Sequence, residues 1–83
     1  MEEKILGLLA LATGTDEVLR EPGLPIWEEG VLDSFGLLEF LSDLEEQLGI
    51  TLYPTQLSHS QLETPRALAA AVMDAARRQG IVK

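Results

Sequence analysis

Residues 34–49 read SFGLLEFLSDLEEQLG, the strongest helical pattern in the chain. Four leucines recur at intervals of four, three and four residues and so share one face of an α-helix. Gly49 can end this helix because glycine readily adopts the left-handed backbone conformation. We therefore predict a helix over residues 34–48 whose apolar face packs into a core. The four leucines are Leu37, Leu41, Leu44 and Leu48.

The opposite side of the predicted helix is acidic and carries Glu39, Asp43, Glu45 and Glu46. No lysine or arginine lies between them, so ion pairs along the helix cannot balance the charge. The pattern fits two interpretations, a solvated helix face and a docking surface for a basic partner. We select Glu39, Asp43 and Glu46 as candidate docking residues.

Three apolar residues close to the start of this helix are assigned individually: Phe35, Leu38 and Phe40. Apolar residues of a helix belong to the core more often than to an interface. We expect Phe40 to lie in the core. Phe35 and Leu38 are the candidates for contact with a partner.

Two further long helices are predicted, one on either side in the sequence. Residues 2–13 carry apolar side chains at helical spacing and stop at Gly14. Thr64 and Pro65 suit the cap and the first position of a last helix, because proline needs no hydrogen-bond acceptor there. This helix is expected to end near Gly80.

The remaining segments are connections. Residues 50–53 fit an extended connector, since no second strand is available to pair with them, and a short helical turn is expected within residues 56–62. Residues 14–33 form a predicted long loop because their prolines and glycines argue against one continuous element. So long a loop is either functional or pinned to the core. The candidate pinning residues are Val18, Leu19, Leu24, Ile26 and Trp27.

Together these elements predict an all-α fold, a small bundle of three main helices plus one short helix. The long loop joins the first predicted helix (residues 2–13) to the second (residues 34–48), and residues 1–83 form a single domain. The composition, 46% hydrophobic and 24% charged, is typical of a folded domain rather than a disordered tail.

Composition also excludes several classes of function. The chain has no cysteine and one histidine, His59, so we predict no disulfide and no metal site, and we assign His59 no function. A net charge of −8 argues against nucleic acid and favours partners with basic surfaces. The apolar run over residues 5–12 is too short to span a bilayer, which predicts a cytoplasmic protein without membrane insertion.

Ser34 stands at the start of the predicted helix, where a serine usually serves as a cap. A nucleophilic serine needs a base within hydrogen-bond reach, but its neighbours are acidic or apolar, and we predict no catalytic residue. The free amides and the positive end of a helix dipole favour a bound anion. Ser34 is therefore better suited to modification than to catalysis.

Asp33-Ser34, opening an acidic and leucine-striped helix after a long loop, resembles the attachment site of acyl and peptidyl carrier proteins. The resemblance is closest to D-alanyl carrier proteins of teichoic-acid D-alanylation, in WEEGVLDSFG (residues 27–36) and LEEQLGI (residues 44–50). A phenylalanine and a glycine after the serine differ from fatty-acid carriers, where leucine or isoleucine commonly follows.

The resemblance implies a covalent 4′-phosphopantetheine on Ser34, placed there by a phosphopantetheinyl transferase. Asp33 would contact that transferase and its metal, or would only add a favourable charge at the helix start. A D-alanine–carrier protein ligase would then load D-alanine as a thioester, for delivery through membrane-bound acyltransferase machinery. The chain would act as a monomeric carrier and not as an enzyme. Separately, the position of Trp27 just ahead of this turn predicts that it packs down and fixes the exit of the loop, with cargo binding as the alternative.

Three alternative functions stay open on the sequence alone. A carrier of the same kind could hold a fatty acyl group, a polyketide or another amino acid. A helical adaptor could use Ser34 only as a cap and carry no arm. An enzyme could use Ser34 as its nucleophile, although no base or oxyanion arrangement is evident.

Overall fold

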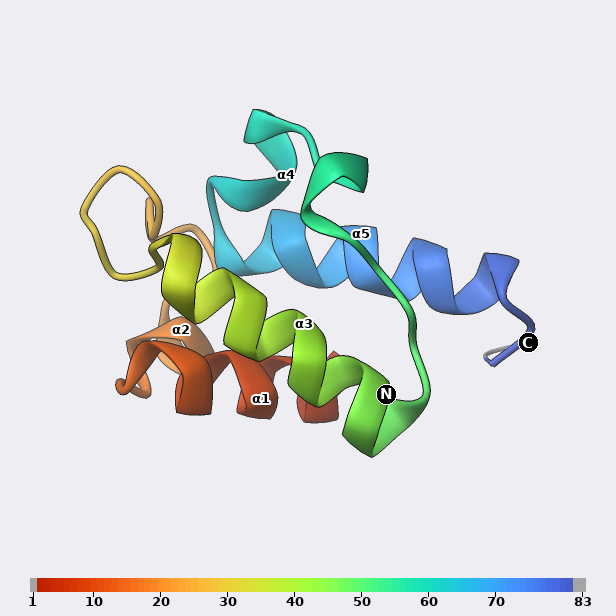
Figure 1. Cartoon of the computed structure of the whole chain (residues 1–83). Helices are drawn as coiled ribbons and strands as arrows, with labels where there is room; N and C mark the ends of the chain where they lie inside the picture. Colours follow the sequence, from red (N-terminus) through yellow and green to blue (C-terminus); the bar gives the residue numbers. More distant parts are fainter. Residues whose placement is uncertain (1, 82–83) are drawn as a thin grey trace.

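A computed structural model describes residues 2–81 of the chain. Within that range the chain contains helices and no strand, which confirms the predicted all-α class. In order, the elements are α1 (Glu2–Thr13), α2 (Glu17–Arg20), α3 (Ser34–Leu48), the 3₁₀ turn η1 (Pro54–Gln56), α4 (His59–Leu62) and α5 (Pro65–Arg78). Helix α1 packs against α2, α3 and α5, and α4 packs on α5 (Figure 1).

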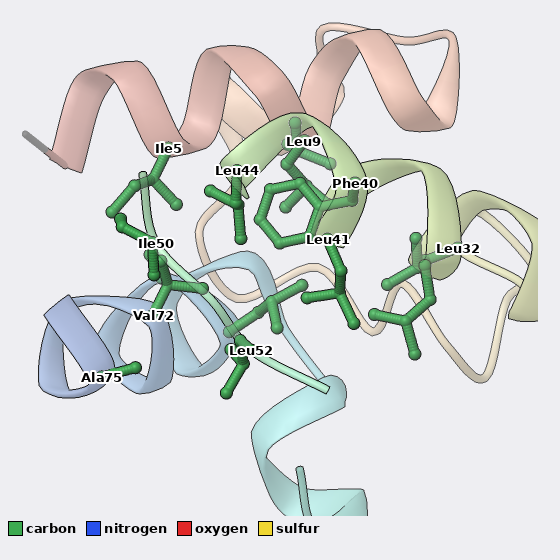
Figure 2. Close-up of a cluster of buried hydrophobic side chains, with 14 of the residues drawn as sticks. Ile5, Leu9, Leu32, Phe40, Leu41, Leu44, Ile50, Leu52, Val72 and Ala75 are labelled. Carbon is green, nitrogen blue, oxygen red and sulfur yellow. The ribbon is translucent and has the colours of Figure 1, made fainter. Parts of the chain in front are cut away.

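The core lies between the three long helices, and Figure 2 shows its side chains converging. Ile5 and Leu9 of α1 meet Phe40 and Leu44 of α3, all four fully buried. Val72 of α5 completes the contact from the far side. Burial of one such side chain contributes about 1.5–3 kcal/mol. The prediction that Phe40 belongs to the core is confirmed.

The structure confirms three predicted helix boundaries, at Gly14, Gly49 and Thr64. Gly14 and Gly49 follow α1 and α3 in the left-handed conformation, with φ of 74° and 72°. Thr64 caps α5, because its Oγ1 accepts a hydrogen bond from the Ala67 amide at 3.1 Å. Pro65 occupies the first helical position and is buried.

The loop between α1 and α3 corrects the prediction in two respects. It contains a one-turn helix, α2, which begins where the Thr15 hydroxyl accepts a hydrogen bond from the Glu17 amide at 3.2 Å. Within this turn Val18 is buried but Leu19 is 49% exposed, because consecutive helical residues point in different directions. Leu19 therefore does not pin the loop. Leu32 does so instead, together with the predicted Val18 and Ile26.

Backbone hydrogen bonds fasten the same loop at its middle and its end. The Ile26 amide donates to the Glu63 carbonyl at 2.9 Å, which ties the loop to the segment before α5. The Leu32 amide donates to the Ile26 carbonyl at 2.9 Å and closes the loop on itself. These bonds fix the position of the chain just before Asp33, and therefore the position at which Ser34 begins α3.

The segment between α3 and α5 is an extended connector at residues 50–53, as predicted, followed by two short turns rather than one. Each turn is closed by a glutamine: Gln56 Oε1 accepts from the Tyr53 amide at 2.8 Å, and Gln61 Oε1 from the Ser58 amide at 2.8 Å. A third glutamine, Gln79, accepts from the Thr51 amide at 3.0 Å and ties the connector to the end of α5.

Candidate attachment site

The junction before α3 is shaped by Asp33. Its backbone is extended, with φ −116° and ψ −177°, and its Oδ1 accepts a hydrogen bond from the Gly36 amide at 2.7 Å. Its carbonyl accepts the Leu37 amide at 2.8 Å, the first backbone bond of the helix. Asp33 is therefore the cap of α3, and its negative charge lies at the positive end of the helix dipole.

Ser34 occupies the first position of α3 and is exposed. Within residues 2–81 its hydroxyl takes part in no hydrogen bond, and neither do the amides of Ser34 and Phe35. The interpretation of Ser34 as the helix cap is thus wrong, because Asp33 already accepts the bond that a capping serine would accept. The hydroxyl is accessible and uncommitted.

Gly36 is buried at this junction, and sequence reasoning did not find its structural role. A Cβ added here would lie 3.3 Å from the Ala12 carbonyl oxygen and 3.4 Å from Leu32 Cδ1. The end of α1 and the start of α3 can approach closely because Gly36 has no side chain. A glycine inside a helix lowers helix stability by about 1 kcal/mol relative to alanine. Its presence in so strong a helical pattern could therefore have indicated a close approach of another segment.

Five of the six predicted docking residues share one face of α3, and the sixth, Asp33, precedes the helix. Phe35 is 75% exposed and Leu38 57%, and Glu39 and Glu46 are exposed beyond them. Asp43 is half-buried at the edge of this face. We name this surface the α3 stripe, defined by Phe35, Leu38, Glu39, Asp43 and Glu46.

The carboxylates of the α3 stripe have no cationic partner in the described part of the chain. Two arginine–carboxylate ion pairs lie elsewhere, between Arg20 and Asp16 and between Arg78 and Asp74, and the His59 imidazole lies near Glu63 away from the stripe. Among residues 2–81 nothing therefore neutralises the negative potential of the stripe, and it can attract a basic surface.

Tyr53 borders the α3 stripe and was not predicted as part of the site. It is 59% exposed and, with Leu38 and Ser42, lines a shallow hollow of about 250 Å³ between α3 and the extended connector. The sequence signal that could have identified Tyr53 is the alternation of side chains in an extended segment. Ile50 and Leu52 point inward, so Tyr53 points outward.

The chemistry open to this site is narrow. No side chain among residues 2–81 lies within hydrogen-bond reach of the Ser34 hydroxyl to act as a base, so a self-activated nucleophile is unsupported. His59 is exposed as expected, with Nε2 at 3.7 Å from Glu63 Oε1. An exposed serine oxygen beside two unbonded amides at a helix N-terminus fits a phosphodiester.

Two properties of the described residues bear on other functions. Residues 2–81 contain no group of three or more histidine, cysteine, aspartate or glutamate side chains arranged to hold a metal ion. None of the helices described is long and apolar enough to cross a membrane.

Comparison with known proteins adds two findings. The family model described as "Phosphopantetheine attachment site" matches residues 3–72. The chain is 40% identical over 73 residues to the D-alanyl carrier protein of Abiotrophia defectiva, covering 87% of this chain and 91% of the relative. It is 37% identical over 68 residues to that of Bacillus pumilus (strain SAFR-032), covering 82% of this chain and 87% of the relative.

Proposed function

The chain belongs to the D-alanyl carrier proteins, within the family that shares the phosphopantetheine attachment site, and we propose that it carries D-alanine for the D-alanylation of teichoic acid. The observation that supports this most directly is the exposed Ser34 hydroxyl, which has no hydrogen bond at the first position of a helix capped by Asp33. Proteins of this kind are carriers and not enzymes. Residues 1–83 act as one carrier domain and as a monomer.

Ser34 is the residue that bears 4′-phosphopantetheine. The group supplies a terminal thiol on a flexible arm, and D-alanine is held there as a thioester. Asp33 fixes the first turn of α3, so the serine oxygen stays at the surface during modification. The amides of Ser34 and Phe35, together with the helix dipole, stabilise the phosphate charge. Attachment to an arm raises the effective concentration of the cargo at each partner without tight docking.

The partners are enzymes that dock on the α3 stripe. A phosphopantetheinyl transferase attaches the arm, an ATP-dependent D-alanine ligase loads it, and membrane-bound acyltransferase machinery takes the cargo in the cytoplasm. Phe35 and Leu38 provide apolar contact, and Glu39, Asp43 and Glu46 attract basic residues of the partner. Because such docking is mainly electrostatic, it forms and dissociates quickly and serves several enzymes in turn.

Intact-mass spectrometry tests the attachment. The wild-type chain and its Ser34→Ala and Ser42→Ala variants are each incubated with coenzyme A and a broad-specificity transferase. Ser42 is the matched control because it is also an exposed serine of α3. We expect one phosphopantetheine on wild type and Ser42→Ala and none on Ser34→Ala. A modified Ser34→Ala, or an unmodified wild type, would contradict the assignment.

A loading assay tests the cargo. The phosphopantetheinylated protein is incubated with ATP and a D-alanine–carrier protein ligase, and separately with ligases for fatty acids and for other amino acids. We expect a mass gain of one alanyl group, removed by hydroxylamine as a thioester, from the D-alanine ligase alone. Loading by another ligase in preference would replace D-alanine with that cargo and retain the carrier role.

A further inference from the structure

A second hollow, of about 160 Å³, lies between the loop before α3 and the junction of α4 with α5. The loop contributes Pro25, Trp27 and Glu28, the start of α4 contributes His59, and the junction contributes Glu63 and Thr64. The hydrogen bond from the Ile26 amide to the Glu63 carbonyl holds its two sides together. Trp27, which is half-buried, is one of the residues that line it.

This hollow lies within reach of an arm on Ser34. The Leu32 amide bonds to the Ile26 carbonyl, so the path from Ser34 through Leu32 and Ile26 to Trp27 limits their Cα separation to about 18 Å. An extended phosphopantetheine has the backbone length of about five residues, or about 17 Å. Its cargo adds further length. Figure 1 shows the loop at the end of the molecule where α3 begins.

The chemistry of the hollow suits a small cation. Two carboxylates, of Glu28 and Glu63, border it, and the face of an indole attracts positive charge. Among the described residues that line it there is no lysine or arginine. Its one basic group is the exposed His59, whose Nε2 lies 3.7 Å from Glu63 Oε1. An aminoacyl thioester carries an α-ammonium group at its end, whereas an acyl thioester of the same size carries none.

We propose that the hollow between Trp27, Glu28 and Glu63 is a resting site for the α-ammonium group of an aminoacyl cargo carried on Ser34. The proposal rests on the function proposed above and adds a part for the carrier itself. It gives the carrier a preference for amino acids over acyl groups, since an uncharged cargo gains nothing from the carboxylates. Each contact is weak and solvent-exposed, so a docking enzyme can withdraw the cargo readily.

Trp27 makes the test direct, because it is the only tryptophan in the chain. Three full-length proteins are prepared with a transferase and synthetic coenzyme A analogues, bearing the free arm, a D-alanyl arm or a propionyl arm, the last two through stable amides. Propionyl has the same carbon skeleton as D-alanyl and lacks the α-ammonium group. We expect the Trp27 emission and its indole N–H resonance to shift for D-alanyl and to remain at the free-arm values for propionyl.

Variants then locate the interaction. Glu28→Gln and Glu63→Gln are each expected to lower the occupancy of the hollow by D-alanyl about two- to fivefold, read from the indole resonance. Glu29→Gln is the matched control, since Glu29 is exposed on the same loop and does not line the hollow. Equal signals for D-alanyl and propionyl arms, or an equal loss in Glu29→Gln, would overturn the proposal. A chain that accepts no arm would instead overturn the proposed function.

Discussion

Helices α3 and α5 begin in the same way and then differ. In each, a side-chain oxygen before the helix accepts the amide of the third helical residue, Asp33 from Gly36 at 2.7 Å and Thr64 from Ala67 at 3.1 Å. The next residue is the exposed Ser34 in α3 and the buried Pro65 in α5. One helix start therefore faces solvent and the other is enclosed by the loop before α3.

The difference shows which features of a helix start serve folding and which serve function. Capping is common to both starts and stabilises each helix, so it does not distinguish a site. An exposed serine hydroxyl without a hydrogen bond and an exposed aromatic residue distinguish the start of α3 from that of α5. The proposed attachment role of α3 therefore depends on the residues after the cap, and substitutions can separate capping from attachment.

The largest expected effect comes from making the start of α3 resemble that of α5. Ser34→Pro should abolish phosphopantetheine attachment and change the free energy of unfolding by less than about 0.5 kcal/mol. The fold tolerates it because Asp33 is extended and the Ser34 amide donates no hydrogen bond in the described range. Intact mass and urea denaturation measure the two quantities.

The reverse exchange is its control. Pro65→Ser places a serine after the cap of α5, at a position that is buried. We expect one arm per chain, still on Ser34, by peptide mapping. A second arm on the new serine would show that a capped helix start is sufficient for attachment.

The first turns of the two helices give the next largest effect. Leu68 in α5 is fully buried, and Leu68→Ala should lower the free energy of unfolding by about 2–5 kcal/mol. Phe35→Ala should change it by less than about 0.5 kcal/mol, because that side chain is 75% exposed, while slowing modification by the transferase. Urea denaturation and a timed mass assay separate these outcomes. A large loss of stability in Phe35→Ala would contradict the partner-facing assignment.

Removing either cap should have an intermediate effect. Asp33→Ala and Thr64→Ala are each expected to lower the free energy of unfolding by about 1 kcal/mol, measured by urea denaturation. Asp33→Asn keeps the acceptor oxygen and removes the charge, so its cost should be limited to about 0.3–1 kcal/mol from the helix dipole. If Ser34→Ala were as destabilising as Asp33→Ala, Ser34 and not Asp33 would contribute the cap.

The smallest effect concerns charge. Glu39→Gln and Glu46→Gln should each slow modification by the transferase about two- to fivefold at low salt, and the difference should shrink at high salt. Glu2→Gln and Glu3→Gln, exposed acidic changes on α1, are the controls and should leave the rate unchanged. A rate that falls equally in all four variants would indicate an effect of net charge and not of the α3 stripe.

The features predicted from the sequence were those set by local patterns. The leucine period of α3, the stop at Gly49 and the cap at Thr64 each depend on residues within a few positions of one another. The exposure of Phe35 and the burial of Phe40 agree with the same period.

The features that the sequence did not predict are of two kinds. Some depend on a choice between two residues of similar propensity, and others depend on segments that are far apart in the chain. Asp33 and Ser34 are both good caps, and only the backbone geometry decides between them. Leu19 and Val18 are both apolar, and the one-turn helix that separates them is too short to be read from periodicity. The hollow beside Trp27 requires a hydrogen bond between residues 26 and 63, which no local pattern contains.

The close approach at Gly36 has a consequence for the thermodynamics of association. With the Ala12 carbonyl and Leu32 packed against it, the first turn of α3 has little room to rearrange. In the proposed function, a partner that docks on α3 meets a surface already in its final shape, so little conformational entropy is lost in ordering that surface. In that function the arm and its cargo supply the motion, and one rigid face can suit a series of enzymes with unrelated folds.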